Sequence, residues 1–327
     1  MAGRTPVGQA GFMWKGHWMN RAAPAQPPWR VVLCTNIPFI PPLIRSSLED
    51  LGHRLEAVVT TPGPRTRRSH DYLEVVANVS PGIDTIVTNR MSRLAPLLTP
   101  FEPDLMIVAG FPWLFPPEVI ALPPRGAVNV HPSLLPRHRG PYPIEWAFRD
   151  GDTQTGLTLH ELGAEFDTGA ILSQLVIPIE DDDDNASIIA RLIENIPDLI
   201  RDGLTRISSG SPGTPQEEGQ ATEARLFEED YRFIDWTQPA RTIHNQVRSW
   251  TGFRGVDAGA IGTVDGTQRI ILRTRLAPAS DTSDATPGTL LAEGNGELLV
   301  QCGDGPLTVT EWIVLDDGTG ATSTGTK

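Results

Sequence analysis

The first 130 residues alternate between short apolar runs and stretches of helical periodicity. Continuous apolar runs are typical of strands that are buried on both faces of a sheet. Helix-like stretches separate several of these runs, and strands that alternate with helices predict a mostly parallel sheet covered by helices. The first part of the chain is therefore expected to be an α/β domain, with strands at 31–34, 55–59, 83–87, 105–109 and 127–130.

The region up to residue 207 continues this domain with a different pattern. The segment Gly156–Ile179 is expected to form two longer strands around 163–167, and Ala186–Ile207 has the periodicity of an amphipathic helix that closes the domain. The acidic run Asp181–Asp184 lies between them. We interpret this run as a solvated turn whose charge stabilises the helix N-terminus, with metal binding as the alternative.

A stretch rich in Gly, Ser and Pro follows and indicates a linker. It runs from Ser208 to Gln220 and contains almost no apolar residues. Beyond it, a helical segment at Pro239–Trp250 precedes short strand candidates that are separated by Gly-rich turns. This pattern predicts a small, open β-barrel, with strands at 260–264, 269–274, 289–292, 298–302 and 307–312.

The chain thus divides into four parts. Residues 1–29 mix Gly, Pro and Ala without a steady period and are expected to form a poorly ordered extension. A Rossmann-like, mostly parallel α/β domain is expected at 30–207, a linker at 208–222, and a smaller OB-like open β-barrel at 223–327. A length of 327 residues is enough for two domains, each with its own core.

Charge and cysteine usage narrow the class of protein. The chain has 27 Lys plus Arg against 40 Asp plus Glu, a formal charge of −13, which gives no global attraction to nucleic-acid backbones or anionic lipids. Cys34 and Cys302 each sit in an apolar stretch and are expected to be buried thiols. No apolar run approaches the roughly 20 residues that span a bilayer, and no signal peptide is evident. We expect a cytoplasmic protein with no membrane partner.

The most informative part of the chain is the segment 126–174. Asn129 and His131 are two positions apart at the end of a predicted strand, so their side chains point to the same face. In open α/β sheets, ligands bind in the crevice beyond the carboxyl ends of the strands. An amide donor and a general base are therefore expected to meet there. Taken singly, the His could be a structural hydrogen-bonding group and the Asn could serve a turn.

Several short motifs extend this pair. They are Asn129-x-His131, Ser133-Leu-Leu-Pro-Arg137 with Arg139-Gly140 after it, Gly156-x-Thr158 and Asp167-Thr-Gly169. In these motifs, and in the 36-residue spacing from His131 to Asp167, the chain resembles the formyltransferase family, which includes methionyl-tRNA formyltransferase, the sugar N-formyltransferases and glycinamide ribonucleotide formyltransferase. A weaker resemblance extends from about Val31 to Trp312, which favours the two-domain members.

The resemblance implies that the domain at 30–207 transfers the formyl group of 10-formyltetrahydrofolate to an amine. In such a reaction the amine attacks the formyl carbon, an oxyanion forms, and a proton passes from the amine to the departing nitrogen. By resemblance, His131 is the proton-transfer group, Asn129 donates its amide to the oxyanion, and Asp167 holds the imidazole or a water in place. No metal ion is implied.

The resemblance also implies a folate pocket in which backbone groups of neighbouring loops hold the pterin. Arg137, His138 and Arg139 either contact the substrate or are solvated charges, and His160 is expected to point outward on its strand. The Ser133–Pro136 segment either contacts the folate or only shapes its loop. The expected folate-binding residues are Phe111, Pro112, Trp113, Leu114, Ser133, Leu135, Glu161 and Gly163.

The identity of the acceptor amine is less determined. Methionyl-tRNA formyltransferase uses a basic loop after its second strand, and the corresponding stretch 60–70 offers only Arg65, Arg67 and Arg68. From Thr205 onward there are 10 basic and 17 acidic residues, an unfavourable surface for RNA. We therefore expect a small-molecule amine, such as an amino-sugar nucleotide or an amino-acid-like metabolite, with the tRNA-acting enzyme as the alternative.

Two further functions would use the same fold. A hydrolase that releases formate from the same folate needs the same three side chains, whereas a non-catalytic folate-binding protein has no need of them. The sequence is compatible with a homodimer and does not decide the oligomeric state.

Overall fold

The computed structural model describes residues 27–64, 71–251, 259–278, 284–315 and 324–325. The expected N-terminal extension lies outside the described residues as far as residue 26. The basic loop that was compared with the tRNA-binding loop also lies outside the described residues at its three arginines, Arg65, Arg67 and Arg68.

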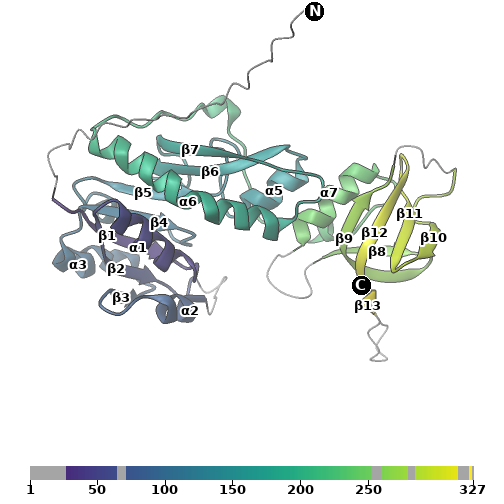
Figure 1. Cartoon of the computed structure of the whole chain (residues 1–327), viewed down its shortest axis with the longest axis horizontal. Coiled ribbons are helices and arrows are strands. Elements are labelled where there is room, and N and C mark those ends of the chain that lie inside the picture. Colours follow the sequence, from purple (N-terminus) through teal and green to yellow (C-terminus); the bar gives the residue numbers. More distant parts are fainter. Residues whose placement is uncertain (1–26, 65–70, 252–258, 279–283, 316–323, 326–327) are drawn as a thin grey trace, which may run out of the picture.

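The first part of the chain forms a seven-stranded sheet of β1 (Arg30–Thr35), β2 (Arg54–Thr60), β3 (Asp84–Val87), β4 (Leu105–Ala109), β5 (Ala127–His131), β6 (Gln154–Glu161) and β7 (Ile171–Pro178). Its order is β3-β2-β1-β4-β5-β6-β7 (Figure 1). The strands β1 to β5 run parallel to one another. Strand β6 is antiparallel to β5, and β7 is antiparallel to β6. Strand β4 is buried along its whole length, which explains its continuous apolar sequence. The expected α/β fold is confirmed.

Helices cover both faces of this sheet. On one face, side chains such as Val31 and Leu33 pack against helices, whereas Val32 and Cys34 face a second core on the other side. This alternation along β1 is the two-residue period of a strand. The first core contains residues of four helices, which are α1 (Ile40–Asp50), α2 (Asp71–Asn78), α5 (Pro143–Arg149) and α6 (Asn185–Ser208). The second core contains residues of η2 (Met91–Arg93), α3 (Leu94–Leu98) and α4 (Pro117–Ile120). The short helix η3 (Thr99–Phe101) follows α3 in the chain.

The acidic run before α6 differs from the expected solvated turn. Asp181 and Asp182 are exposed, but Asp183 and Asp184 are buried. The side chain of Asp184 accepts a hydrogen bond from the Ser187 N–H at 2.9 Å and caps α6, so the expected stabilisation of the helix N-terminus is present. Among the described residues, no group of three or more His, Cys, Asp or Glu side chains is arranged to hold a metal ion.

The second domain is an antiparallel sheet of β8 (Ala260–Val264), β9 (Thr267–Leu276), β10 (Leu290–Gly294), β11 (Glu297–Gln301) and β12 (Pro306–Val314), with the two-residue β13 (Thr324–Gly325) beside β12. Its order is β10-β11-β12-β9-β8. Helix α7 (Ala240–Trp250) contributes Ile243 and Val247 to the core of this domain. Each of the five strands that the sequence predicted is present, and β13 is a sixth. Cys34 and Cys302 are both buried free thiols, as expected.

The two domains meet at the acidic turn and at α5 and α7 (Figure 1). Arg248 of α7 donates to the backbone carbonyl of Glu180 at 2.8 Å and lies over the ring of Phe148, 4.8 Å from its centroid. His244 donates to the carbonyl of Asp181 at 2.8 Å. Arg273 of β9 forms an ion pair with Asp184. The acidic run is thus a junction between the domains as well as a helix cap.

The segment predicted to be a linker lies against the first domain rather than crossing open solvent. Thr214 and Ile171 exchange two backbone hydrogen bonds of 2.8 Å. Further along, after η4 (Glu218–Gln220), the backbone pairs with Arg139, and η5 (Glu229–Arg232) follows. Within the described part of the chain, no helix is both long and apolar enough to cross a membrane.

Candidate active site

Strand β5 ends with the two polar residues that the sequence singled out. Asn129 and His131 alternate with buried Val128 and Val130, whose apolar side chains hold the strand in the sheet. The neighbouring antiparallel strand β6 places His160 opposite Asn129 and Thr158 opposite His131. Residues from two strands therefore face the same space.

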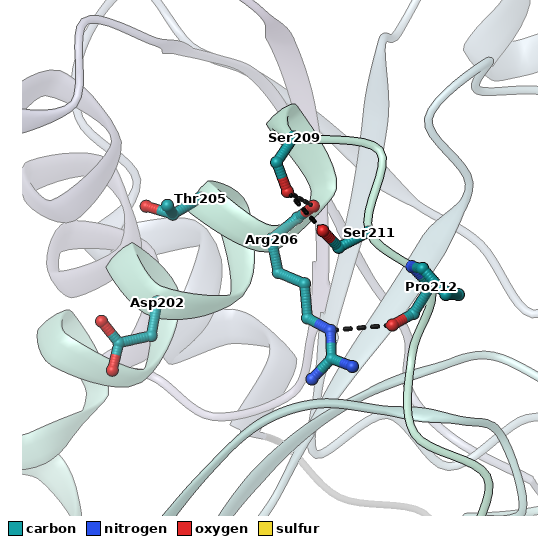
Figure 2. A pocket seen from close by; sticks show the side chains of 6 residues that line it. All are labelled: Asp202, Thr205, Arg206, Ser209, Ser211 and Pro212. Carbon is teal, nitrogen blue, oxygen red and sulfur yellow. Dashed lines mark hydrogen bonds between the residues drawn. The ribbon is translucent and has the colours of Figure 1, made fainter.

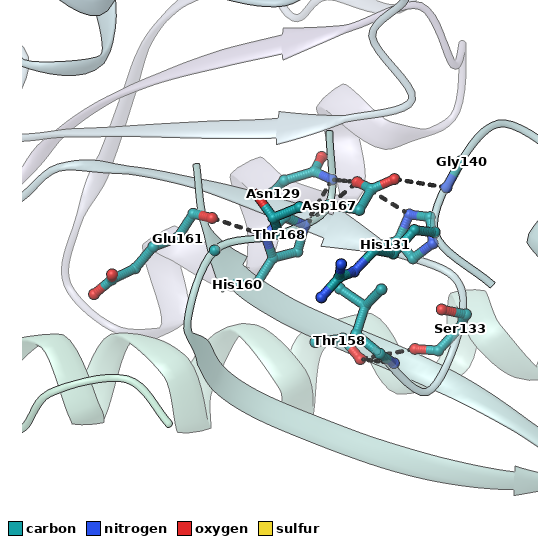
Figure 3. Close-up of polar contacts among 12 residues, drawn as sticks. Asn129, His131, Ser133, Gly140, Thr158, His160, Glu161, Asp167 and Thr168 are labelled. Carbon is teal, nitrogen blue, oxygen red and sulfur yellow. Dashed lines mark hydrogen bonds and ion pairs between the residues drawn. The ribbon is translucent and has the colours of Figure 1, made fainter. Parts of the chain in front are cut away.

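Asp167 comes from the loop between β6 and β7 and completes the cluster (Figure 3). Its Oδ1 accepts a hydrogen bond from Asn129 Nδ2 at 3.3 Å and lies 3.5 Å from His131 Nδ1. Its Oδ2 accepts from the backbone N–H of Gly140 at 2.9 Å. The structure thus brings Asp167 together with Asn129 and His131, although Asp167 is 36 positions from His131 in the sequence.

Gly140 is needed where it stands. Its φ of +120° is unfavourable for other residues, and a Cβ there would lie 2.8 Å from the backbone oxygen of Ala224. The loop can therefore lie against the backbone at Ala224, with the Gly140 N–H directed to Asp167, only because this residue has no side chain.

The carboxylate of Asp167 is ionised in this environment. Burial by itself raises its pKa, but the neighbouring rings of His131 and His160 and the Gly140 N–H outweigh that effect and lower the pKa to about 2. Asp167 is therefore a buried anion at neutral pH.

His131 is a neutral imidazole whose free nitrogen faces this anion. Its Nε2 lies 2.9 Å from the backbone carbonyl of His138, and because a carbonyl only accepts, Nε2 carries the hydrogen. The lone pair is then on Nδ1, toward Asp167. Burial lowers the pKa of His131, and the attraction of Asp167 offsets this only in part. A proton taken up on Nδ1 would lie between the imidazole and the carboxylate.

His160 does not point outward as expected; it belongs to the cluster. It is fully buried. Its Nδ1 donates to the carbonyl of Glu161 at 2.8 Å, so its Nε2 is an acceptor and lies 3.1 Å from Asn129 Nδ2. Strand β6 is buried on both faces from Thr155 to His160, so alternation along it offers no solvent-facing side. The signal that could have found His160 is its antiparallel pairing with Asn129.

The loop after His131 is held by internal hydrogen bonds. Ser133 Oγ donates to the carbonyl of Arg137 at 2.7 Å, and Thr158 Oγ1 donates to the carbonyl of Ser133 at 2.7 Å. The backbone of Leu135 is bonded to Thr158 and Gln174. In the structure, Ser133 and Leu135 thus shape the loop.

The three charged residues that follow are also engaged with the protein. Arg137 Nη2 lies 2.8 Å from Asp152 Oδ1, and His138 Nε2 lies 2.7 Å from Asp152 Oδ2. His138 is buried, so the expectation of a solvated charge is wrong for it. Arg139 bonds Gln216 and Glu218.

The remaining expected folate-binding residues lie on two loops. Phe111 is buried and stacks on Phe115 with ring centroids 5.3 Å apart. Trp113 donates to Thr61 Oγ1 at 3.2 Å, while Leu114 is exposed. Pro112 lies between them in sequence. On the other loop, Glu161 is exposed at the end of β6, and Gly163 follows it closely.

In the described part of the chain, the structure has two surface hollows that are lined neither by Asn129, His131 and Asp167 nor by the expected folate-binding residues. One, of about 570 Å³, is lined by residues of the C-terminal end of α6 and the turn after it (Figure 2). There, Arg206 already donates to the carbonyl of Pro212 at 2.8 Å, and Ser209 donates to Ser211 at 2.9 Å. The other, of about 180 Å³, lies beside Arg137, His138 and Asp152. We place the candidate site at Asn129, His131 and Asp167 on chemical grounds.

These features define a class of chemistry. A neutral buried imidazole beside a buried carboxylate, with an amide donor on the same carboxylate, is suited to moving a proton and stabilising an oxyanion at a carbonyl centre.

Comparison with known proteins identifies the family. Residues 67–201 match the formyl transferase model and residues 227–315 match the formyl transferase C-terminal domain model. The chain is 33% identical over 271 residues to methionyl-tRNA formyltransferase of Pelobacter propionicus, covering 81% of this chain and 82% of that protein. The same enzyme of Trichlorobacter lovleyi is 29% identical over 289 residues, covering 86% and 89%. The chain belongs to the formyl transferase family, and it is a folate-dependent formyltransferase.

A solved structure with the same fold is the N-formyltransferase of Helicobacter canadensis, crystallised with folinic acid and dTDP-3-aminofucose. It superposes with a TM-score of 0.60 at 16% identity, over 86% of this chain and 98% of that chain. At this identity the likeness concerns the fold.

Proposed function

We propose that this enzyme transfers the formyl group of 10-formyltetrahydrofolate to the α-amino group of the methionine carried by an initiator tRNA. The observation that supports this acceptor is the similarity to methionyl-tRNA formyltransferases at 33% and 29% identity, over 82% and 89% of their lengths. This similarity favours methionyl-tRNA as the acceptor over the small-molecule amine that the net charge of the chain indicated. Net charge describes the whole surface and leaves room for a local basic patch.

His131, in this proposal, moves the proton. The amine nitrogen forms a bond to the formyl carbon, and the bond from that carbon to N10 breaks with its electron pair going to N10. The amine loses a proton to His131 Nδ1, and the resulting imidazolium gives a proton to N10, which leaves tetrahydrofolate, a formamide and neutral His131. The imidazolium formed on the way is stabilised by Asp167 on one side and by the His138 carbonyl on the other.

Asn129 stabilises the oxyanion. Both hydrogens of its amide have partners in the structure, His160 Nε2 at 3.1 Å and Asp167 Oδ1 at 3.3 Å. The bond to Asp167 is the longer one, and Asp167 also has the Gly140 N–H. The formyl oxygen would therefore take the hydrogen that now points to Asp167, while His160 keeps the amide in place.

The folate is proposed to lie against the loop at Phe111–Leu114 and the segment from Glu161 to Asp167. Leu114 and Phe166 are exposed apolar side chains on these two loops, and covering them with a pterin would remove apolar surface from water. Backbone groups of the loops would supply the polar contacts.

The test is an acceptor comparison that follows tetrahydrofolate release from 10-formyltetrahydrofolate. We expect turnover with methionyl initiator tRNA and far less with uncharged tRNA, amino-sugar nucleotides or free amino acids. Activity should fall steeply with added salt, because binding a polyanion releases counterions.

A small-molecule acceptor is the second candidate, favoured by the 10 basic and 17 acidic residues from Thr205 onward. Salt-insensitive turnover with an amino sugar or amino acid would support it over tRNA. Turnover without any acceptor would indicate a hydrolase, and folate binding without turnover would indicate a binding protein.

A further inference from the structure

The segment between the domains contacts both loops that carry the candidate catalytic groups. Thr214 pairs with Ile171 just after the Asp167 loop, and Glu223 pairs with Arg139 beside the His138 loop. The intervening residues include two side chains, Gln216 and Thr222, that bond these loops directly. A spacer whose only task is to join two domains would not need such contacts.

Gln216 is bonded through its whole amide. Its Nε2 donates to the backbone carbonyls of Asp167 and Gly169, each at 2.8 Å. Its Oε1 accepts from Arg139 Nη2 at 2.8 Å and Nε at 3.1 Å. One side chain therefore ties the Asp167 loop to the Arg139 loop.

The backbone at Asp167 needs such support. Its φ of 58° is left-handed, a conformation that is unfavourable for a residue other than glycine. The conformation directs the carboxylate toward His131 Nδ1 and the Gly140 N–H. By holding the carbonyls of Asp167 and Gly169, Gln216 stabilises that conformation.

Thr222 has the corresponding place on the other loop. Its Oγ1 accepts from the backbone N–H of His138 at 2.9 Å, and its carbonyl accepts from the N–H of Arg139 at 2.9 Å. His138 is also left-handed, with a φ of 58°. Its carbonyl is the group that accepts from His131 Nε2.

We propose that Gln216 and Thr222 are positioning residues for the reaction, so that the interdomain segment is part of the active site. Gln216 orients Asp167 and Thr222 orients the carbonyl that determines the tautomer of His131. The inference rests on the proposed function of the trio, and it predicts that changes in the segment alter catalysis without touching substrate.

The test compares Gln216→Met, which keeps the length of the side chain and removes its hydrogen bonds, with Gln220→Met, the same change at an exposed position of the same segment. We expect kcat of Gln216→Met to fall on the order of tenfold, with the KM for the folate donor near that of wild type. Gln220→Met should behave as wild type. Thr222→Val should also lower kcat, and Thr222→Ser, which restores the hydroxyl, should recover it.

A second measurement separates positioning from general destabilisation. The pKa of His131 is followed by NMR, with its resonance identified by its loss in His131→Gln. The charged or titratable groups that act on this ring are Asp167, His160 and His138. A misplaced Asp167 supports the imidazolium less well, so the pKa of His131 should fall in Gln216→Met and stay constant in Gln220→Met.

The outcomes distinguish this inference from the proposed function. If wild type is active but Gln216→Met matches Gln220→Met in kcat and in the pKa of His131, the inference is overturned. It is also overturned if Gln216→Met only melts earlier, with an unchanged pKa. If wild type uses no acceptor, the proposed function fails, while the comparison of the two pKa values still decides whether Gln216 positions Asp167.

Discussion

His131 is held between two oxygen acceptors while it has only one hydrogen to donate. The carbonyl of His138 takes that hydrogen, and the carboxylate of Asp167 faces the bare Nδ1 at 3.5 Å. The resting site is thus arranged for the protonated ring, which could donate to both, but burial keeps the ring neutral. A base in this state is unprotonated and free to accept a proton, and Asp167 supplies a counter-charge for the imidazolium that forms.

The pH dependence follows from this arrangement. Because burial lowers the pKa of His131 and the neutral form is the active one, kcat/KM should rise with pH and level off below the ordinary His value of about 6.5. The measurement is kcat/KM from about pH 4.5 to 8, with His131→Gln as the control. An acid limb that survives unchanged in a still active His131→Gln variant would belong to another group, such as the acceptor amine.

The sequence predicted the trio because its members stand in recognisable motifs, and it missed His160 because burial depends on what covers a strand. Asn129 and His131 are two residues apart, and that spacing alone places them on one face of β5. Helix α6 packs on the face of β6 that carries Leu157 and Leu159. His160 lies on the other face, where Asn129 and the Asp167 loop cover it, and no local pattern at His160 reports those contacts.

At the level of elements, the hydrophobic pattern identified the central strands of the first sheet well because β1, β2, β4, β5 and β6 are buried along most of their length. The interdomain segment was harder. Its Gly, Ser and Pro content correctly indicates irregular backbone, but its contacts are hydrogen bonds to residues such as Arg139 and Asp167, about 50 to 80 positions away in sequence. Composition carries no information on such pairings.

Helix α6 offers a direct test of the acidic turn. Asp184→Ala removes the side chain that caps the helix and pairs with Arg273, so the free energy of unfolding should fall by about 1–2 kcal/mol in a urea titration. Asp182→Ala, at an exposed position two residues earlier, should change it by less than about 0.5 kcal/mol. Equal effects of the two substitutions would contradict a specific role for Asp184.

On the scale of the whole molecule, the junction between the domains is polar and partly buried. His244 is buried and donates to the carbonyl of Asp181. Burial lowers the pKa of this ring to about 4, with Arg248 acting in the same direction. Folding therefore selects the neutral ring, whereas the unfolded chain binds a proton below about pH 6.5.

The free energy of unfolding should therefore decrease as the pH falls below about 6.5. Since the unfolded state binds more protons between about pH 6.5 and 4, the contribution of neutral His244 is complete above pH 6.5 and is lost as the pH falls toward 4, by at most about 3 kcal/mol. His244→Gln should flatten the dependence of the unfolding free energy on pH in this range. An identical slope in wild type and variant would show that the junction does not titrate through His244.

The account as a whole depends on formyl transfer at Asn129 and His131, and single-turnover transfer to the preferred acceptor measures it most directly. With saturating substrates, Asn129→Ala should lose on the order of 100- to 1000-fold in rate and His131→Ala roughly 100- to 10,000-fold, with folate affinity little changed. A correctly folded variant of either residue that keeps more than about a tenth of the wild-type rate would contradict the account, because that margin lies well outside the expected losses.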